Sequence, residues 1–326
     1  MIIEQRKQRG IALITILMIL AIMVTVATTM TGRMTSSLLR TEGLSFSQKV
    51  YWYGQASVEF SRIILNDDFA DSSVVSLDQI WATPGMVFPV DNGTISGSLK
   101  DFRSCFNINA IAQADSDNGR ALPVRQFQAL LEALEIEEYQ AEVISESVRD
   151  WIDTNNTVDG SQGAEDRIYE ARTVPYLTAN NLMVDISELR GVQGVTAAIY
   201  ERIVPYLCAL PVEDQLINVN TVDVEQPEIL YALFAPEVPL SIEDFEQLLE
   251  DRPVSGWSST SDFLAENILT SYSIPGDITS QLSVTSEYFH LYGVAEIHER
   301  SMAFKLLFQI EDKKATTIRF QYVGIE

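Results

Sequence analysis

The N-terminal part of the chain is dominated by an uncharged run of 22 residues, 11–32. As an α-helix this run would extend roughly 33 Å at about 1.5 Å per residue, which is enough to cross the hydrocarbon core of a bilayer. Three basic residues and one acidic residue precede it. This charge bias predicts a cytoplasmic N-terminus, with the remaining chain across the membrane. The composition of the segment alone is typical of an uncleaved signal-anchor helix.

Helical spacing of apolar residues resumes beyond this run. Residues 33–48 contain no proline, and apolar positions then fall on one stripe at Tyr53, Ala56, Phe60, Ile63 and Ile64. We therefore expect one helix from residue 11 to about residue 65, whose second half packs on a sheet through this stripe. Residues 66–92 are rich in turn signals and are expected to form a loop.

Period-two alternation of apolar and polar residues predicts strands on either side of a long helical region. Residues 94–106 form a plausible first strand. Three segments near the C-terminus alternate in the same way, and a charged turn at residues 311–314 separates the last two, which is typical of an antiparallel meander. Their apolar positions are Phe289, Leu291, Ala295 and Ile297, then Met302, Phe304, Leu306, Phe308 and Ile310, then Ile318, Phe320 and Tyr322.

Helical periodicity dominates between these strand regions, from residue 107 to about 285. Residues 126–138 carry leucines and a phenylalanine at helical spacing, and Ser241 is placed to cap a second such segment. The predicted fold is α+β, a long N-terminal helix on a small antiparallel sheet, interrupted by a large all-α insertion. The expected segments are residues 11–32 in the membrane, 33–106 and 286–326 in the α/β domain, and 107–285 in the insertion.

Charge and composition narrow the function. The chain has 46 acidic and 22 basic residues, a net charge of -24, so its surface would repel phosphate backbones and disfavours a nucleic-acid partner. No phosphate-binding loop, nucleophile elbow or zinc-type cysteine spacing is present. The only histidines, His290 and His298, would lie about 27 Å apart on an extended strand and could not share a metal or proton. The sequence therefore predicts no enzymatic activity.

Residues 185–195 contain a G-V-x-G-V turn between two helical patterns, similar to a helix-hairpin-helix. In DNA-binding hairpins of this kind the backbone amides contact phosphate. Because the surrounding charge is strongly negative, we interpret the motif here as a folding unit or a protein contact.

The loop after residue 152 is crowded with oxygen-bearing side chains, and calcium takes six to eight oxygen ligands. With Asn155 as the first position, several residues fall at offsets similar to those of an EF-hand, although an aspartate replaces the usual final glutamate. The alternative is a solvated acidic loop stabilised by Asx turns. The candidate ligands are Asp153, Asn155, Thr157, Asp159, Glu165 and Asp166, with Gly160 at the turn.

Cys105 and Cys208 are the only cysteines of the chain. After translocation they would face an oxidising compartment, where a disulfide is favoured over the alternative of two buried free thiols. Such a bond would connect the end of the first strand region to the middle of the insertion.

The N-terminus also has a distinctive order of features, in which a short basic leader ends at Gly10 and the apolar helix starts with Ile11-Ala12-Leu13-Ile14. This order resembles the class III leader of type IV pilins and type II secretion pseudopilins. The resemblance implies that residues 1–10 are a leader, that prepilin peptidase cuts between Gly10 and Ile11, and that the new N-terminus at Ile11 is methylated.

Most proteins with this leader carry glutamate at the fifth mature position, which here is Thr15. The chain resembles the minor pseudopilin K family (general secretion pathway protein K), which lacks this glutamate and carries a large helical insertion. Three further segments resemble landmarks of that family: residues 104–109, residues 150–153 with 163–166, and residues 216–221. The family's insertion binds calcium, which favours calcium binding over the solvated-loop alternative.

The resemblance implies a single-pass protein of the inner membrane of a Gram-negative bacterium, with its C-terminal domain in the periplasm. Its expected place is the tip of the type II secretion pseudopilus, where it would cap the filament together with minor pseudopilins I and J and the other pseudopilus subunits. Contact with secreted cargo is also expected. Two alternatives are a membrane-anchored calcium- or solute-binding module, which would keep residues 1–10, and a membrane-anchored hydrolase, which would need a carboxylate pair in a cleft.

Overall fold

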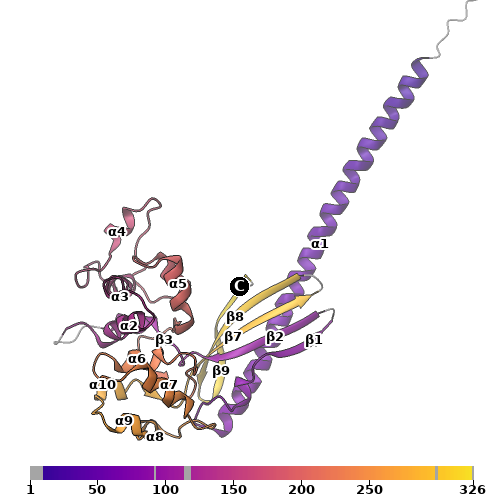
Figure 1. Cartoon of the computed structure of the whole chain (residues 1–326). Helices are drawn as coiled ribbons and strands as arrows, with labels where there is room; N and C mark the ends of the chain where they lie inside the picture. The colour runs from indigo at the N-terminus through magenta and orange to yellow at the C-terminus, as the bar shows by residue number, and fades with distance from the viewer. Residues whose placement is uncertain (1–9, 92, 114–118, 298–299, 325–326) are drawn as a thin grey trace, which may run out of the picture.

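The computed structural model describes residues 10–91, 93–113, 119–297 and 300–324 of the chain (Figure 1). A long helix, α1 (Ile11–Asp71), runs from the N-terminal end into a globular part, as predicted, but ends later than residue 65. Its first half is exposed along its whole length, and its most apolar window of 18 residues has a mean hydropathy of 2.7. Among the described residues, α1 is the one helix long and apolar enough to cross a membrane.

The face of α1 that packs on the sheet agrees only in part with the stripe predicted from the sequence. The buried residues include Val50, Val58, Leu65 and Phe69, with Gly54 and Ser61 between them. Ile64 is buried and Tyr53 packs against the same core as expected, but Ala56, Phe60 and Ile63 are exposed. The reason is steric, because a Cβ at Gly54 would lie only 3.3 Å from the ring of Phe320. Small residues at this contact let the helix lie close to the sheet, and the bulky ones face outward.

The sheet has five antiparallel strands in the order β1-β2-β7-β8-β9, with bounds β1 (Met86–Val90), β2 (Gly93–Asp101), β7 (Tyr288–Ile297), β8 (Arg300–Glu311) and β9 (Lys314–Val323). The C-terminal meander is as predicted, and its tight turn uses Asp312 and Lys313, both with positive φ. The expected loop before residue 92 was wrong in part, since it contains the 3₁₀ turn η1 (Ile80–Ala82) and β1. β1 includes Pro89, which an edge strand tolerates.

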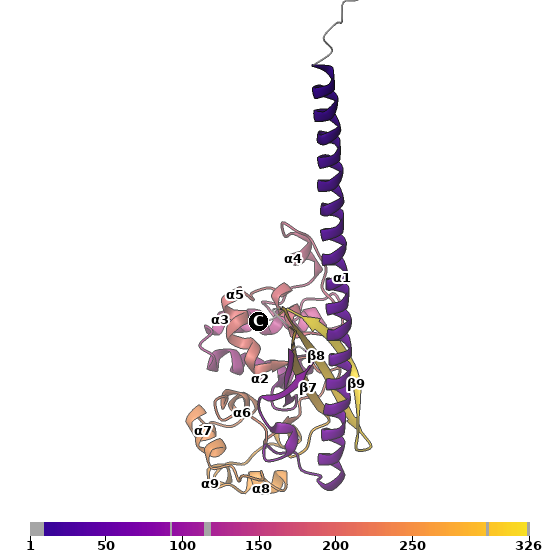
Figure 2. The same cartoon turned by 90° about the vertical axis from the view of Figure 1, so that its right-hand side faces the viewer.

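Each face of the sheet packs on a different partner. Phe289, Leu291 and Phe304 belong to the core shared with α1. On the opposite face, Tyr288 and Leu307 pack against Cys105, Cys208 and Leu210 of the insertion. The sheet therefore lies between α1 and the insertion (Figure 2).

The insertion leaves the sheet between two neighbouring strands, because β2 ends at Asp101 opposite Phe289 of β7. This end of the sheet is the one remote from the membrane helix, since the opposite end places Arg300 over the ring of Phe46 in the middle of α1. The first half of the insertion contains β3 (Phe106–Asn107), η2 (Ile108–Ala112), α2 (Leu122–Ala133), α3 (Glu138–Ile152), α4 (Asp166–Glu170), η3 (Ile186–Gly191), α5 (Ala197–Ile203), η4 (Val204–Tyr206) and β4 (Leu207–Cys208).

The second half contains β5 (Ile217–Asn218), α6 (Glu228–Phe234), α7 (Ile242–Glu250), α8 (Thr260–Leu264), α9 (Asn267–Thr270), α10 (Gly276–Thr279) and β6 (Leu282–Ser283). Ser241 caps α7 as predicted, in a capping box with Asp244. The helix expected at residues 126–138 starts and ends earlier, as α2, because the chain turns through Glu135 at a φ of 59°. The first strand likewise ends at Asp101, and residues 106–107 form the separate strand β3.

The two halves of the insertion are built around the same motif, Asn-x-Asn. In each half a two-residue strand pairs in parallel with the strand that closes that half, β3 with β4 and β5 with β6. The side chain of Asn109 donates to the carbonyls of Met183 and Leu210, and Asn220 exchanges two hydrogen bonds with the backbone of Trp257. These buried amides satisfy backbone groups that have no helix or sheet partner.

The hairpin-like motif at residues 185–195 is a packing unit in the structure. Its first element is the 3₁₀ helix η3, which begins with a capping box between Asp185 and Glu188. Gly194 turns the chain at a φ of 86°, and a Cβ there would meet Gln140 and Ile144 of α3. The turn is therefore covered by α3, in agreement with the interpretation of a folding unit.

A buried arginine fixes the base of the insertion. The side chain of Arg103, 1% exposed, forms ion pairs with Asp214 at 2.9 Å and with Glu287, and its guanidinium lies over the ring of Tyr288. Arg103 follows β2, Glu287 precedes β7, and Asp214 lies between the two halves of the insertion. The Arg103 side chain thus connects three segments: the one that enters the insertion, the one between its two halves, and the one that returns to the sheet.

Candidate metal centre

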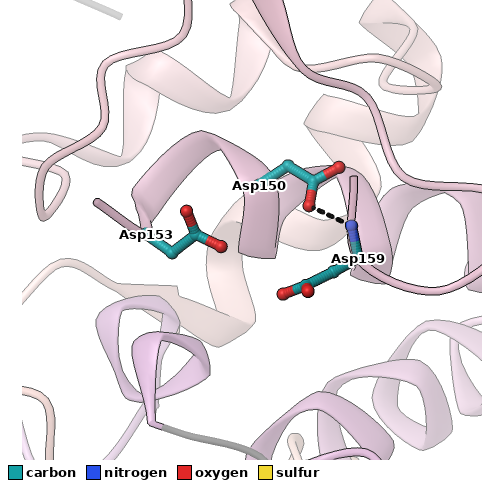
Figure 3. A group of neighbouring side chains, drawn as sticks. All are labelled: Asp150, Asp153 and Asp159. Carbon is teal, nitrogen blue, oxygen red and sulfur yellow. Dashed lines mark hydrogen bonds between the residues drawn. The ribbon is translucent and has the colours of Figure 1, made fainter. Parts of the chain in front are cut away.

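Three carboxylates converge where α3 ends and the following loop folds back over it. Asp150 lies in the last turn of α3, Asp153 caps its C-terminus, and Asp159 belongs to the loop (Figure 3). One oxygen from each lies within 4.8 Å of the others. The Asp159 backbone N–H donates to Asp150 Oδ1 at 2.8 Å and holds the loop against the helix.

Four buried carboxylate oxygens in this region have no hydrogen-bond partner in the part of the chain that the structure describes. They are Asp150 Oδ2, Asp153 Oδ2 and both Oε atoms of Glu165. Asp150 and Glu165 are 0% and 4% exposed. Because a buried carboxylate without a partner costs several kcal/mol, this arrangement calls for a positive ligand.

The electrostatics of the cluster agree with this. Burial, followed by the neighbouring carboxylates, raises the pKa of Asp150 to about 7. Burial also raises the pKa of Asp153 and of Glu165, and Asp159 adds to both effects. Without a cation, the cluster would therefore take up protons to relieve its charge.

Neighbouring residues fix the loop over the carboxylates. Glu146 Oε2 accepts from the Gln162 backbone N–H at 2.6 Å, and Arg149 Nε donates to Asp159 Oδ2 at 2.5 Å. A Cβ at Gly163 would fall 2.3 Å from Asp150 Oδ2, so only glycine allows the backbone to pass this close. These contacts hold the loop, and with it the carboxylates, in place over the end of α3.

The structure brings together some of the predicted ligands and separates others. Asp153 and Asp159 belong to the group of three converging carboxylates, and Glu165 lies close enough for its charge to raise the pKa of Asp150. Asn155 and Thr157 are exposed, and Asn155 Oδ1 accepts from the Thr157 backbone N–H in an Asx turn. Asp166 faces another segment, since Thr178 donates to it twice and lowers its pKa.

Asp150 was missed because the EF-hand register was counted within the loop, whereas Asp150 lies in the helix before it. The signal was present in the sequence as a pair of aspartates three positions apart at the end of a helical pattern, Asp150 and Asp153. Positions three apart lie on the same side of a helix.

The donor set consists of oxygen atoms alone. Hard divalent cations such as calcium prefer carboxylate and carbonyl oxygen, whereas zinc and copper sites use imidazole or thiolate. The unpartnered buried oxygens therefore fit a calcium ion, which Asp150, Asp153, Asp159 and Glu165 would hold. Such an ion would neutralise the cluster and tie the loop to α3.

The other candidate residues lie far from this cluster. Cys105 and Cys208 form a disulfide with a Cα–Cα distance of 5.8 Å, within the ordinary range for such bonds. Gly10 and Ile11 are exposed at the start of α1, and leader residues 1–9 lie outside the described residues. His290 is stacked on Phe102 and burial lowers its pKa to about 3, while His298 lies outside the described residues.

Comparison with known proteins gives consistent matches. Two models of the type II secretion system protein K family match residues 104–212 and 217–285. Type II secretion system protein K of Aeromonas hydrophila is 37% identical over 330 residues, covering 98% of this chain and 99% of that protein. The protein of the same description from Pectobacterium carotovorum subsp. carotovorum is 38% identical over 329 residues, covering 98% and 97%.

A solved structure matches as well. It is that of the GspK-GspI-GspJ complex from the type 2 secretion system of enterotoxigenic Escherichia coli. The similar chain is 34% identical and superposes with a TM-score of 0.80, covering 88% of this chain and 100% of that one. The mixed α/β fold, with its long helix, sheet and helical insertion, is therefore shared.

Proposed function

Because the chain belongs to the type II secretion system protein K family, we propose that it is the minor pseudopilin that caps the tip of the periplasmic pseudopilus. In this role it acts structurally in the export of folded proteins across the outer membrane. The membership and the apolar helix α1 indicate a single-pass membrane anchor with a periplasmic domain. The membrane is the inner membrane, and prepilin peptidase cleaves between Gly10 and Ile11 and methylates Ile11.

The observation that carries the capping proposal is the position of the insertion. It leaves the sheet at the end remote from the membrane, between β2 and β7, and spreads beside the sheet on the face opposite α1 (Figures 1 and 2). The insertion would therefore occupy space that a further subunit would need on that side of the filament. The disulfide and the ion pairs of Arg103 fix the base of the insertion, which restricts its movement relative to the sheet.

Thr15 supports the same position in the filament. A glutamate buried among apolar helices needs a cationic partner, because an unpaired charge there costs several kcal/mol. The Thr15 hydroxyl donates to the Ala12 carbonyl of its own helix at 2.9 Å. This side chain is satisfied without any neighbour, which suits a terminal subunit that has no amine beyond it to bind.

The partners in this proposal are minor pseudopilins I and J, which accompany the similar chain in the Escherichia coli complex, and the remaining pseudopilus subunits. Secreted cargo would meet the insertion. The net charge of -24 argues against nucleic acid as a partner.

Calcium is the proposed structural ion of the cluster at Asp150, Asp153, Asp159 and Glu165. The four unpartnered buried oxygens support this assignment. The ion's contribution would be to hold the loop on α3 and so keep the first half of the insertion rigid.

The N-terminus of the mature protein tests the proposal against its main alternative, a membrane-anchored calcium- or solute-binding module. The full chain is produced with a prepilin peptidase, purified from membranes and analysed by mass spectrometry of its N-terminal peptide. We expect methylated Ile11 as the first residue, and Gly10→Leu should leave the leader in place. An intact leader on the unsubstituted chain would contradict the proposal.

A further inference from the structure

The hairpin-like motif at residues 185–195 packs against the helix end that carries the acidic cluster. Trp151 directly follows Asp150 in the last turn of α3. Its indole ring lies next to the motif, since a Cβ at Gly191 would fall 3.1 Å from that ring. The motif and the candidate metal centre are therefore neighbours in the fold, although they are far apart in the sequence.

Residues 165–178, here called the α4 lobe, connect the cluster to the motif. The lobe begins at Glu165, which is buried and has two carboxylate oxygens without a hydrogen-bond partner in the described residues. Tyr169 of α4 is fully buried, and its ring meets that of Trp151 edge-on at a centroid distance of 5.3 Å. The lobe thus contacts the end of α3 both at the acidic cluster and through an aromatic pair.

Arg172, just beyond α4, binds the lobe to the motif. Its Nη1 donates to the Gly191 carbonyl at 3.2 Å and its Nη2 to Gln193 Oε1 at 2.8 Å. Its guanidinium lies over the rings of Tyr169 and Tyr176, 4.8 and 5.2 Å from their centroids. Tyr176 also donates to the Gly191 carbonyl at 2.7 Å, and Tyr169 accepts from the Gln193 backbone N–H at 3.1 Å. The motif is therefore held by side chains of the lobe.

The attachment of the lobe to α3 depends on the charge at the cluster. Burial raises the pKa of Asp150, and Glu165 makes the largest contribution of any neighbouring charge to that increase. Without a cation, the two carboxylates repel each other and disfavour the position of Glu165 at the end of α3. A divalent cation bound by both would convert this repulsion into attraction.

We propose that calcium at the acidic cluster locks the hairpin-like motif through the α4 lobe, with Arg172 as the positioning residue between them. The inference rests on the calcium assignment proposed above. With the ion bound, Glu165 stays at the end of α3 and Arg172 stays bonded to the motif. Without the ion, the lobe detaches at Glu165, and the motif keeps only its own contacts with α3.

The lock would fix the shape of an apolar surface. Ile168, Val174 and Leu177 of the α4 lobe are 44%, 75% and 56% exposed. Exposed apolar groups of this kind are candidate contact surfaces. Their relative positions are maintained only while the lobe is attached to α3 and to the motif.

Hydrogen exchange followed by mass spectrometry tests the lock. The full chain, purified in detergent at pH 8, is compared in chelator and in millimolar calcium. We expect calcium to slow exchange at least tenfold in peptides that cover residues 166–178 and residues 189–193. Peptides from residues 217–285, in the second half of the insertion, are the internal control and should change less than twofold. Slower exchange in the lobe with unchanged exchange at residues 189–193 would overturn the proposal.

Arg172→Met removes the connection and leaves the candidate metal ligands in place. Calcium should still slow exchange around residues 159–166 in this variant, but by less than twofold at residues 189–193. Arg190→Met is the matched control, because Arg190 also lies over a tyrosine ring, that of Tyr200 at 5.8 Å, but has no hydrogen bond to the lobe among the described residues. The control should keep the tenfold effect, and a tenfold effect in Arg172→Met would overturn the role of Arg172.

A milder variant covers the case in which Arg172→Met unfolds the first half of the insertion. Tyr176→Phe loses only the hydroxyl that donates to Gly191. We expect it to reduce the calcium effect at residues 189–193 to half or less of its value in the unsubstituted chain. An undiminished effect would count against the lock.

Calorimetric titration with calcium separates failure of the lock from failure of the calcium assignment. If the unsubstituted chain binds no calcium at millimolar concentration, the calcium assignment fails and the lock fails with it. If the chain binds calcium, Asp150→Asn removes the binding and residues 189–193 still do not respond, only the lock fails. Because coupling is reciprocal, Arg172→Met should weaken calcium binding by no more than the factor by which calcium slows exchange at the motif.

Discussion

Replacing Asp150 by asparagine should change the stability of the protein in opposite directions with and without calcium. The pKa of Asp150 is about 7 in the folded, metal-free chain against an ordinary value of 3.8. Between these two values the folded state binds more protons than the unfolded state, so metal-free stability falls as pH rises from about 4 to 7 and stays low above pH 7.

The size of the effect follows from the shift. A difference of about 3 pKa units corresponds to about 4 kcal/mol at ~1.36 kcal/mol per unit, and solvent screening near the loop reduces this to about 2 kcal/mol. Asparagine keeps the acceptor for the Asp159 N–H but removes the charge. Asp150→Asn should therefore stabilise the metal-free chain by about 2 kcal/mol at pH 8 and have little effect at pH 4.

With calcium bound, the effect of Asp150→Asn on stability should have the opposite sign. An ion at a concentration 100 times its dissociation constant stabilises the folded state by about 2.7 kcal/mol, and the substitution should remove most of that gain. Thermal melting of the purified full chain at pH 4 and pH 8, in chelator and in millimolar calcium, measures both effects. For a cooperative unit of this size, 2 kcal/mol corresponds to roughly 4 to 8 °C.

Asp166→Asn is the matched control on the same loop. Hydrogen bonds from Thr178 lower the pKa of Asp166, so its charge favours the folded state and its removal should lower stability in chelator. The reasoning is refuted if Asp150→Asn destabilises the metal-free chain at pH 8, or if calcium stabilises this variant as much as the unsubstituted protein.

Three further substitutions test the packing. Replacing Cys105 and Cys208 by alanine opens a loop of 103 residues and should cost about 4 to 5 kcal/mol in denaturant melts; free thiols detected in the native protein after denaturation would contradict the bond. Gly54→Leu should lower stability by about 1 to 3 kcal/mol, because its side chain would collide with Phe320; an unchanged melting temperature would argue against the close helix–sheet contact. Arg103→Met should cost about 3 kcal/mol and increase proteolysis at the base of the insertion; equal resistance to protease would show that the cation does not fix the junction.

The architecture could be predicted from the sequence where a single rule governed the local pattern. An uncharged run of membrane length, period-two alternation and a capping serine each indicated its element correctly. The packed face of α1 could be found only in part in this way, because hydrophobicity alone cannot distinguish a stripe that the sheet buries from one that stays exposed. Gly54 decides the contact by being small, which a search for apolar residues overlooks.

The acidic loop shows a similar limit. The sequence identified the right segment: Asp153 and Asp159 lie in the group of three carboxylates, and Glu165 lies close enough for their charges to raise its pKa. Whether a carboxylate or amide oxygen is free to bind a cation depends on the hydrogen bonds that it already accepts. Those hydrogen bonds depend on how the loop folds. Asn155 is occupied by its own turn and Asp166 by Thr178, whereas Asp150 enters from the helix.

The position of the protein in the filament tests the central claim most directly. Pseudopili that contain the full chain can be labelled with gold particles through an antibody against the insertion and viewed by electron microscopy. The proposed tip role predicts label at one end of each filament and none along the shaft. Label repeated at regular intervals along the shaft would contradict it, since the insertion beside the sheet would block the stacking of a further subunit.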